Sequence, residues 1–307
     1  MGCCCSCFKR GKNNDSLSEL NHELLPNSSV EHRHYEIYNK YLDNINFIKP
    51  LSNNNNVYKV KYQGNISILR IIYRTKDFIR ELNVAKKRSN IEDCKVSEFE
   101  TEETFDDSTV VNGGLIIYRF IPGIDLWKYL VDKNDKLSES LTKRIIRSIL
   151  IPLKSLHDNN IIHGDIKLEN IICKHNNPED CYLIDLGMST LISQDMIFKN
   201  IDYSCGTIPF VAPEIVISRK IGLGSDIWSL GCLMYLLLFF KHPFNNNPTL
   251  FSDAILSCST QLADLKAFSL GRISDPCIDL IFKMLEPDIS CRINIDEILK
   301  HPWIIED

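Results

Sequence analysis

Two short stretches of the sequence carry side chains suited to phosphate and metal chemistry. Asp165, Lys167 and Asn170 lie within six residues of one another, and Asp185 follows in Ile184-Asp185-Leu186-Gly187. Carboxylate and amide oxygens are ligands that Mg²⁺, a hard cation, prefers. A lysine ammonium neutralises anionic oxygens, and a positioned carboxylate accepts a proton. These residue types suit phosphoryl transfer, which depends on positioning and charge neutralisation more than on covalent catalysis.

Further landmarks follow these residues in a fixed order. In chain order the set is His163-Gly164-Asp165 with Lys167 and Asn170, Asp185-Leu186-Gly187, Ala212-Pro213-Glu214, Asp226-Ile227-Trp228-Ser229-Leu230-Gly231, Arg292 and His301-Pro302-Trp303. No single landmark is specific, but with all six the chain resembles the eukaryotic protein kinases over about residues 35–304. Lys167, two residues after Asp165, resembles the lysine that serine/threonine kinases carry at this position. The ending His301-Pro302-Trp303-Ile304 resembles calmodulin-dependent and calcium-dependent kinases.

The resemblance implies an α+β, two-lobed protein kinase fold, with a small β-rich N-lobe at about residues 35–121 and a larger helical C-lobe at about 122–304. The implied function is a serine/threonine protein kinase that uses ATP and Mg²⁺ and acts on protein substrates. Asp165 would accept or orient the proton of the substrate hydroxyl, and Lys167 would neutralise charge on the γ-phosphate. Asn170 and Asp185 would bind Mg²⁺.

Other landmarks have structural or docking roles in the family. Glu214 resembles the partner of Arg292 in a buried ion pair. Asp226 resembles the helix residue that holds the backbone of the catalytic loop. Cys205-Gly206-Thr207 resembles the loop on which the substrate docks.

The N-lobe departs from the family at the nucleotide site. The residues Val57, Arg70, Glu81 and Tyr118, together with Asp185, occupy the positions that the resemblance assigns to nucleotide binding. The stretch Pro50–Val57 contains no glycine, although the family cradles phosphates with G-x-G-x-x-G. Arg70 stands where the family has lysine. Arginine keeps the positive charge but not the geometry of the lysine ammonium. Lys59 and Lys61 lie on the same strand face as Val57 and could substitute for the missing lysine. Lysines that alternate along a strand are, however, also explained simply by exposure to solvent.

These departures leave two further functions open. The first is a catalytically weak or dead pseudokinase that acts as a membrane-tethered interaction scaffold. The second is a small-molecule phosphotransferase, which resembles the chain at Asp165, Asn170 and Asp185 but lacks Ala-Pro-Glu and Asp-x-Trp-Ser-x-Gly. Gly164 replaces the arginine with which relatives bind a phosphate on the activation loop. We therefore do not expect the usual activation by phosphorylation of Ser189, Thr190, Ser193 or Ser204.

The N-terminus fits a lipid anchor. Gly2 with Ser6 matches the myristoylation pattern M-G-x-x-x-[ST]. Because one myristoyl chain binds membranes only marginally, a second signal is needed. Palmitoylation of Cys3, Cys4, Cys5 or Cys7 and the basic run Lys9-Arg10-Gly11-Lys12 are the candidates. We expect residues 1–34 to form a flexible, lipidated tether and the protein to lie at the cytoplasmic face of a membrane, with the plasma membrane as the expected one.

Hydrophobic periodicity predicts the elements that position these residues. Val57–Tyr62 and Ile66–Tyr73 form a hairpin signal around Gln63-Gly64-Asn65, and Asp77–Arg88 is a helix candidate. Residues 92–107 are acidic and predict a solvated strand and loop, whereas Leu115–Phe120 predicts a buried strand. Ile145, Ile149, Leu153 and Leu156 share one helix face. Two helix starts are predicted, with Asp275 as the N-cap before Pro276, and with Asn294 and Glu297 as a capping box.

Composition excludes several classes. Hydrophobic residues make up 44% of 307, so the chain as a whole is not disordered. The longest apolar run, Leu230–Phe240, is shorter than the ~20 residues that span a bilayer and predicts a buried helix. A net charge of −5 argues against a generic nucleic-acid binder. The eight cysteines from Cys94 to Cys291 are scattered singly, which is typical of buried thiols in a reducing compartment.

Two expectations concern partners. Asp125 and Glu169 match acidic positions that bind arginine upstream of the phosphorylated residue in basophilic kinases, although both are equally explained as solvated carboxylates. Only three residues follow Ile304 and no EF-hand loop pattern occurs, so we expect no direct calcium binding.

Overall fold

A computed structural model describes residues 45–51, 56–72, 75–89, 99–107, 111–174, 177, 179–203, 205–244 and 271–306. Several sequence predictions therefore lie wholly or partly outside the described residues: the acylation sites at Gly2, Cys3, Cys4, Cys5 and Cys7, the tether, the glycine-free stretch at 52–55, residues 92–98 of the acidic segment, Ser204, Cys94 and Cys258.

Five strands form the sheet of the N-terminal part. They are β1 (Ile45–Pro50), β2 (Val57–Tyr62), β3 (Asn65–Ile72), β4 (Phe99–Asp107) and β5 (Val111–Arg119), in the order β1-β2-β3-β5-β4. The predicted hairpin is confirmed as β2 and β3, with Tyr62 opposite Asn65. Its loop is Gln63-Gly64, whose φ angles of 48° and 85° are both left-handed. Such two-residue loops match the twist of antiparallel strands.

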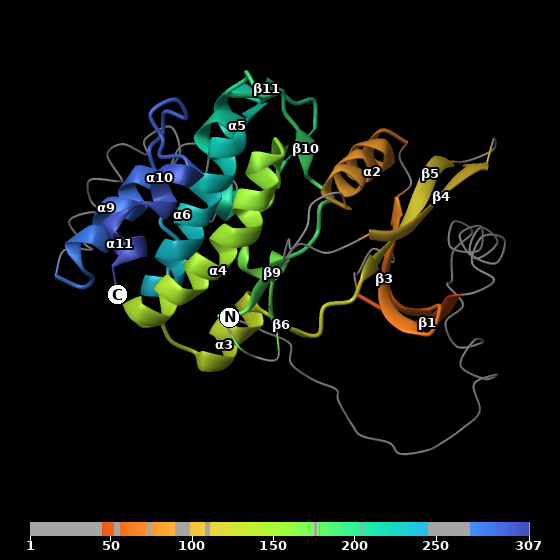
Figure 1. The fold of residues 1–307 in the computed structure, drawn as a ribbon, viewed down its shortest axis with the longest axis horizontal. Helices are drawn as coiled ribbons and strands as arrows, with labels where there is room; N and C mark the ends of the chain where they lie inside the picture. Colours follow the sequence, from red (N-terminus) through yellow and green to blue (C-terminus); the bar gives the residue numbers. More distant parts are fainter. Residues whose placement is uncertain are drawn as a thin grey trace, which may run out of the picture. The chain divides into compact units, whose positions relative to one another are not determined.

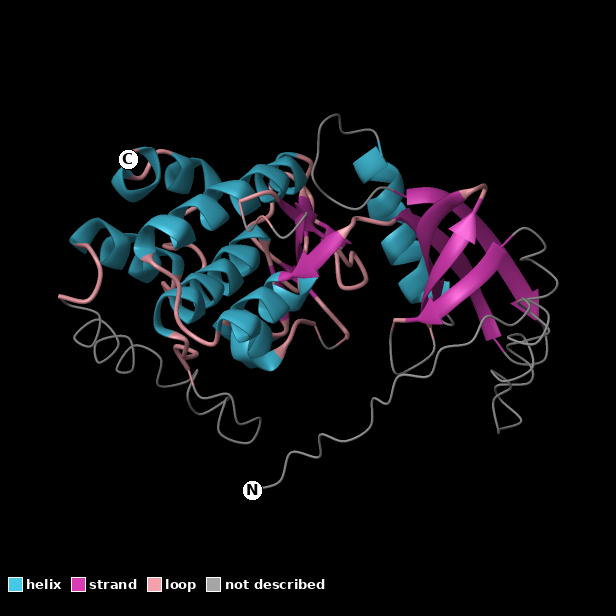
Figure 2. Cartoon of the chain, turned by 90° about the horizontal axis from the view of Figure 1, so that it is seen from below, coloured by secondary structure: helices cyan, strands magenta, loops and turns pink. Residues whose placement is uncertain are grey.

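One amphipathic helix, α2 (Thr75–Ser89), packs against this sheet (Figure 2). Its buried residues Phe78, Leu82 and Ala85 contact Ile116 and Tyr118 of β5. The helix approaches closely because Gly114 has no side chain: a Cβ there would lie 2.2 Å from the Phe78 ring. This packing fixes Glu81, on α2, beside the predicted nucleotide residues of β3 and β5.

The C-terminal part is mainly helical. Its described helices are α3 (Leu126–Lys133), α4 (Glu139–Asp158), α5 (Pro213–Ser218), α6 (Leu223–Phe239), α9 (Asp275–Met284), α10 (Ile295–Leu299) and α11 (Pro302–Ile305). The core is built on α4 and α6, which pack against each other (Figure 1). The face of α4 predicted from Ile145 to Leu156 is buried, and the predicted apolar helix is buried as α6. Among the described residues no helix is long and apolar enough to cross a membrane.

Short strands and turns carry the residues of the predicted site. β6 (Gly123–Asp125), β8 (Ile171–Lys174) and β9 (Cys181–Leu183) form one small sheet, and β7 (Ile161–Ile162) pairs with β10 (Thr190–Leu191). β11 (Lys199–Asn200) pairs with β12 (Lys220–Ile221), and the 3₁₀ turns are η1 (Leu168–Asn170) and η2 (Ile208–Phe210). Together with the helical core they complete the α+β arrangement predicted from the sequence, a β-rich part followed by a larger helical part.

The starts of the last helices test the capping predictions. Asn294 and Glu297 form the predicted capping box at α10. The predicted N-cap Asp275 is wrong: Ser274 caps α9, its hydroxyl accepting from Cys277 N at 3.3 Å, and Asp275 is the first helical residue. Both residue types cap helices well. A tertiary contact decides which of the two residues is the N-cap, because Ser274 also donates to Glu139 from its backbone N–H and its hydroxyl.

A buried ion pair ties α5 to the C-terminal helices. Arg292 donates from Nη1 and Nη2 to the two carboxylate oxygens of Glu214, at 2.9 and 3.0 Å. It also donates to the carbonyl oxygens of Gly224, Glu286 and Pro287. The predicted pair is therefore present, and its guanidinium is fully buried.

Replacing Arg292 by methionine should destabilise the fold, because the Glu214 carboxylate would stay buried without its cation. We expect Arg292→Met to lower the free energy of unfolding by about 3–5 kcal/mol in urea titrations. Arg144→Met is the matched control, since the ion pair of Arg144 with Glu179 is exposed and is worth about 0–1 kcal/mol. Equal losses in both variants would contradict this account.

Candidate active site

The carboxylate of Asp226, on α6, anchors the loop that follows β7. Its Oδ2 accepts from the backbone N–H of His163 at 2.9 Å, and its Oδ1 accepts from that of Gly164 at 2.8 Å. His157 Nε2 lies 2.9 Å from the same Oδ2. Asp226 is 1% exposed, and a buried carboxylate is tolerated only where such donors satisfy it. This bears out the sequence-based role of Asp226.

His163 and Gly164 fix the loop on its other side. His163 Nε2 lies 3.1 Å from the carbonyl oxygen of Ile184, and its Nδ1 accepts from Asp165 N at 3.3 Å. Because Nδ1 accepts a hydrogen bond, Nε2 is the ring nitrogen that can donate to the Ile184 carbonyl oxygen. Gly164 has a φ of 79°, and a Cβ there would lie 2.8 Å from the Met188 carbonyl oxygen. The loop therefore has this shape partly because residue 164 has no side chain.

Asp165 receives hydrogen bonds from three side chains. Lys167 Nζ lies 2.7 Å from Oδ2, Asn170 Nδ2 donates to Oδ2 at 3.0 Å, and the Thr207 hydroxyl donates to Oδ1 at 2.8 Å. Lys167 Nζ also donates to Thr207 Oγ1 at 2.8 Å. An alcohol hydroxyl thus lies at hydrogen-bonding distance from both the predicted base and the predicted phosphate-neutralising cation. That is the arrangement a substrate hydroxyl needs.

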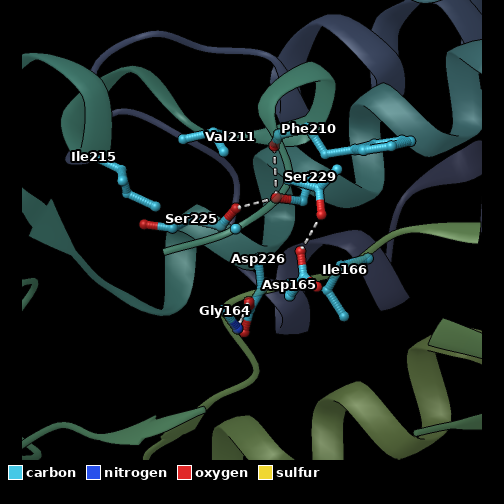
Figure 3. Close-up of a pocket in the computed structure, with 11 residues that line it drawn as sticks. Gly164, Asp165, Ile166, Phe210, Val211, Ile215, Ser225, Asp226 and Ser229 are labelled. Atoms are coloured by element: carbon cyan, nitrogen blue, oxygen red, sulfur yellow. Dashed lines mark hydrogen bonds between the residues drawn. The ribbon is translucent and has the colours of Figure 1, made fainter. Parts of the chain in front are cut away.

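A small cavity adjoins this cluster (Figure 3). Gly164, Asp165 and Ile166 line it from the loop, Thr207, Phe210 and Val211 line it from η2 and its flanks, and Ser225, Asp226 and Ser229 line it from α6. The Ser229 hydroxyl donates to the Phe210 carbonyl oxygen at 2.8 Å and so joins η2 to α6. The segment that carries Thr207 is therefore tied to the helix that anchors Asp165.

Asp185 is the second acidic residue of the site. It follows β9, has a φ of 63°, and accepts from Gly187 N through Oδ1 at 3.0 Å. Arg70 Nη1 lies 3.0 Å from the same oxygen. Desolvation by the surrounding protein acts to raise the pKa of Asp185, but Arg70 and the Gly187 N–H hold that pKa below its ordinary value. The carboxylate is therefore ionised near neutral pH.

Asn170 and Asp185 together fit a magnesium ion that also binds phosphate. The backbone N–H of Ile184 donates to the Asn170 carbonyl oxygen at 3.0 Å, which brings the two residues' segments side by side. Asn170 uses its Nδ2 group for Asp165, so its amide oxygen is the atom that suits a cation. Among the described residues no three His, Cys, Asp or Glu side chains gather as a metal site. Mg²⁺ commonly takes few protein oxygens, with water and substrate phosphates completing its shell.

Arg70 links the sheet, α2 and Asp185. It lies on β3 opposite Val57 of β2, and its Nε donates to Glu81 Oε2 at 3.1 Å. The Tyr118 hydroxyl donates to Glu81 Oε1 at 2.7 Å. Burial raises the pKa of Glu81, and Arg70 and Tyr118 only partly offset it. Burial acts to lower the pKa of Arg70, but Glu81 and Asp185 outweigh it and raise that pKa.

The other sequence-predicted residues lie as follows. Lys59 Nζ lies 4.0 Å from the centre of the Phe120 ring, a cation–π contact. Asp125 is the N-cap of α3, its Oδ1 accepting from Lys128 N, whereas Glu169 is exposed. Of the cysteines, Cys173, Cys181, Cys205, Cys232 and Cys277 are buried thiols and Cys291 is an exposed one.

Two contacts of the site are not predicted by the sequence. Thr207 was noted only as part of a docking loop, and its contact with Asp165 is not visible from spacing. Arg80 was not singled out, yet its Nη2 donates to the Gly187 carbonyl oxygen at 2.7 Å. Its position directly before Glu81 gives no signal, because successive residues of a helix do not face the same side.

Comparison with known proteins gives the family. The protein kinase domain family matches residues 52–304. Death-associated protein kinase 2 of Mus musculus is 35% identical over 192 residues, which cover 62% of this chain and 50% of that protein. Smooth muscle myosin light chain kinase of Gallus gallus is 31% identical over 196 residues, covering 63% of this chain and 10% of that protein.

A third relative, serine/threonine-protein kinase D2 of Rattus norvegicus, is 30% identical over 192 residues, covering 62% of this chain and 21% of that protein. The matched region thus spans half or less of each of these three relatives. The family match covers most of the chain, and the two-lobed α+β fold and the loop around Asp165 agree with it. The chain belongs to the protein kinase domain family.

Proposed function

We propose that this protein transfers the γ-phosphoryl group of Mg·ATP to serine or threonine hydroxyls of proteins. The observation that carries the proposal is the Asp165 cluster, in which Lys167, Asn170 and a threonine hydroxyl converge on one carboxylate. The similarity to serine/threonine-protein kinase D2 of Rattus norvegicus supports the same reaction class.

Each residue of the cluster has a distinct role in this proposal. Asp165 accepts or orients the proton of the substrate hydroxyl at Oδ1, the oxygen to which Thr207 donates. Lys167 neutralises charge on the oxygens of the transferred group. Asn170 and Asp185 hold Mg²⁺, which when bound supplies positive charge to the phosphate oxygens. Gly187 N and Arg70 keep the Asp185 carboxylate ionised for that purpose.

A second candidate is a pseudokinase that serves as a membrane-tethered scaffold. The observation that favours it is the ion pair of Arg70 with Asp185, because the guanidinium occupies a carboxylate oxygen that a metal ion needs. We place the kinase first because Asp165, Lys167, Asn170 and Asp185 are all present with compatible geometry. Weak nucleotide affinity is the expected consequence of Arg70.

Two further parts of the proposal concern partners. We propose substrates with arginine upstream of the phosphorylated residue, recognised by Glu169 and by the Asp125 oxygen that does not cap α3. We also propose acylation at Gly2 with Cys3, Cys4, Cys5 or Cys7, which would place the protein at the cytoplasmic face of a membrane.

Replacing the proposed base tests the kinase directly. Radiolabelled transfer from Mg·ATP to serine peptides with and without upstream arginine should fall about 10²–10⁴-fold in Asp165→Asn, because the amide cannot accept the proton. Thermal unfolding checks that the variant is folded. Absence of transfer by folded wild-type protein would instead favour the scaffold, and equal rates for the two peptides would remove the arginine preference.

Replacing Arg70 by lysine tests the cause of weak nucleotide binding. The shorter ammonium is expected to keep Glu81 and release the Asp185 oxygen, because lysine lacks the planar fork that bridges two carboxylates. Calorimetry with Mg·ATP should show up to about fivefold tighter binding, the range of one weak ion pair. Arg70→Met, which removes the cation, should bind more weakly than either. Weaker binding by Arg70→Lys than by wild type would show that the fork is required.

Replacing Gly2 by alanine tests the anchor. Gly2→Ala blocks myristoylation and should move the protein from the membrane pellet to the supernatant after cell fractionation. Gly11→Ala, outside the pattern, is the control and should stay in the pellet. A free glycine amine and unmodified thiols in the mass spectrum of the native N-terminus would refute the proposal.

A further inference from the structure

Arg80 contacts three separate parts of the protein. Its Nη1 pairs with Asp77 Oδ1 on α2 at 2.9 Å, and its Nη2 donates to the Gly187 carbonyl oxygen at 2.7 Å. Its Cζ lies 4.4 Å from the centre of the Tyr203 ring. One side chain therefore joins α2, the turn that carries Asp185 and the segment that leads to Thr207.

The Tyr203 contact is made by the ring and not by the hydroxyl. The hydroxyl is buried beside Thr190 but forms no hydrogen bond of normal geometry, and burial raises its pKa. A guanidinium over an aromatic face is attracted by the ring quadrupole, more strongly when the pair is shielded from water. The ring is thus the part of Tyr203 that Arg80 holds.

Arg80 lies over the Tyr203 ring, whereas Gly164, Cys205 and Lys199, among the described residues, do not supply this contact. Gly164 has no side chain, and the Cys205 thiol lies against its carbonyl oxygen at 3.3 Å. Lys199 donates to Thr190 Oγ1 at 2.8 Å and to the Leu191 carbonyl oxygen at 3.1 Å, so it is committed within its own segment.

We infer that Arg80 is a positioning residue that fixes the Asp185 turn through Gly187 and docks the segment before Thr207 by stacking on Tyr203, without a phosphate group. Gly187 is two residues after Asp185, and Tyr203 is four residues before Thr207, whose hydroxyl contacts Asp165. A single guanidinium on α2 thereby positions both the turn that carries Asp185, the proposed metal ligand, and the segment that contacts Asp165, the proposed base. The inference rests on the proposed kinase function only for its kinetic consequence.

The test compares four single variants of the full chain and one double variant, Arg80→Met/Tyr203→Leu. Arg80→Met removes the donors and the charge, Tyr203→Leu removes the ring, and Tyr203→Phe keeps the ring. Lys76→Met is the control, because Lys76 is an exposed cation on the same helix. Amide hydrogen exchange is measured without nucleotide, and kcat and KM for Mg·ATP are measured with a serine peptide.

We expect Arg80→Met and Tyr203→Leu each to speed exchange of the peptides covering residues 186–203 by about tenfold, the size of a partly shielded cation–π contact. Their kcat should fall by a similar factor, with a smaller change in KM. Tyr203→Phe should restore wild-type exchange, and Lys76→Met should not differ from wild type. The double variant Arg80→Met/Tyr203→Leu should be little worse than Arg80→Met, because both changes break one contact.

Three results would overturn the inference: unchanged exchange in Arg80→Met, effects of the two single variants that simply add, or loss of wild-type activity after phosphatase treatment. If Arg80→Met fails to fold, the comparison of Tyr203→Leu with Tyr203→Phe decides in the same way. Wild-type protein that shows the expected exchange pattern but no phosphate transfer would refute the proposed function and leave the positioning role standing.

Discussion

The buried carboxylate of Asp226 sets the geometry on which the site depends. A carboxylate buried in the helical core needs hydrogen-bond donors, and here they are the backbone N–H groups of His163 and Gly164, with His157 Nε2 beside them. Satisfying Asp226 therefore fixes the path of the loop. That path places Asp165 at the end of β7, where Lys167, Asn170 and Thr207 reach its two oxygens. An internal electrostatic requirement thus produces a positioned base.

Two arginines determine how the rest of the site is held. Arg70 binds the side chain of Asp185, and Arg80 binds the carbonyl oxygen of Gly187 two residues later. Both act from the β-rich part with its helix α2, so they join that part to the turn that carries Asp185, the proposed metal ligand. The same Arg70 contact that orders the carboxylate also competes with a cation for it. The site therefore combines a proposed base, Asp165, held by several donors with a proposed metal ligand, Asp185, whose Oδ1 already pairs with Arg70.

Much of this was predictable from the sequence because it depends on local pattern or on landmark spacing. The hairpin at Gln63-Gly64, the buried face of α4 and the apolar α6 follow from periodicity and turn chemistry. The Glu214–Arg292 pair followed from the resemblance to a family.

The misses have a common cause in contacts between distant residues. The N-cap of α9 is Ser274 and not Asp275, since Glu139, far away in the chain, selects between two equally good capping residues. Thr207 with Asp165 and Arg80 with Gly187 are likewise contacts over 42 and 107 residues of sequence. Local preference carries no information about such pairs. The contacts that could not be predicted are therefore those between residues that folding alone brings together.

The most direct test of the central claim is phosphate transfer to a serine peptide as a function of Mg²⁺ concentration, for wild type and Asp185→Asn. The account predicts transfer that rises to saturation with Mg²⁺ in wild type and is lost in Asp185→Asn, because the amide no longer offers an anionic ligand. Folded wild-type protein that transfers no phosphate at any Mg²⁺ concentration, or equal transfer by both proteins, would contradict it.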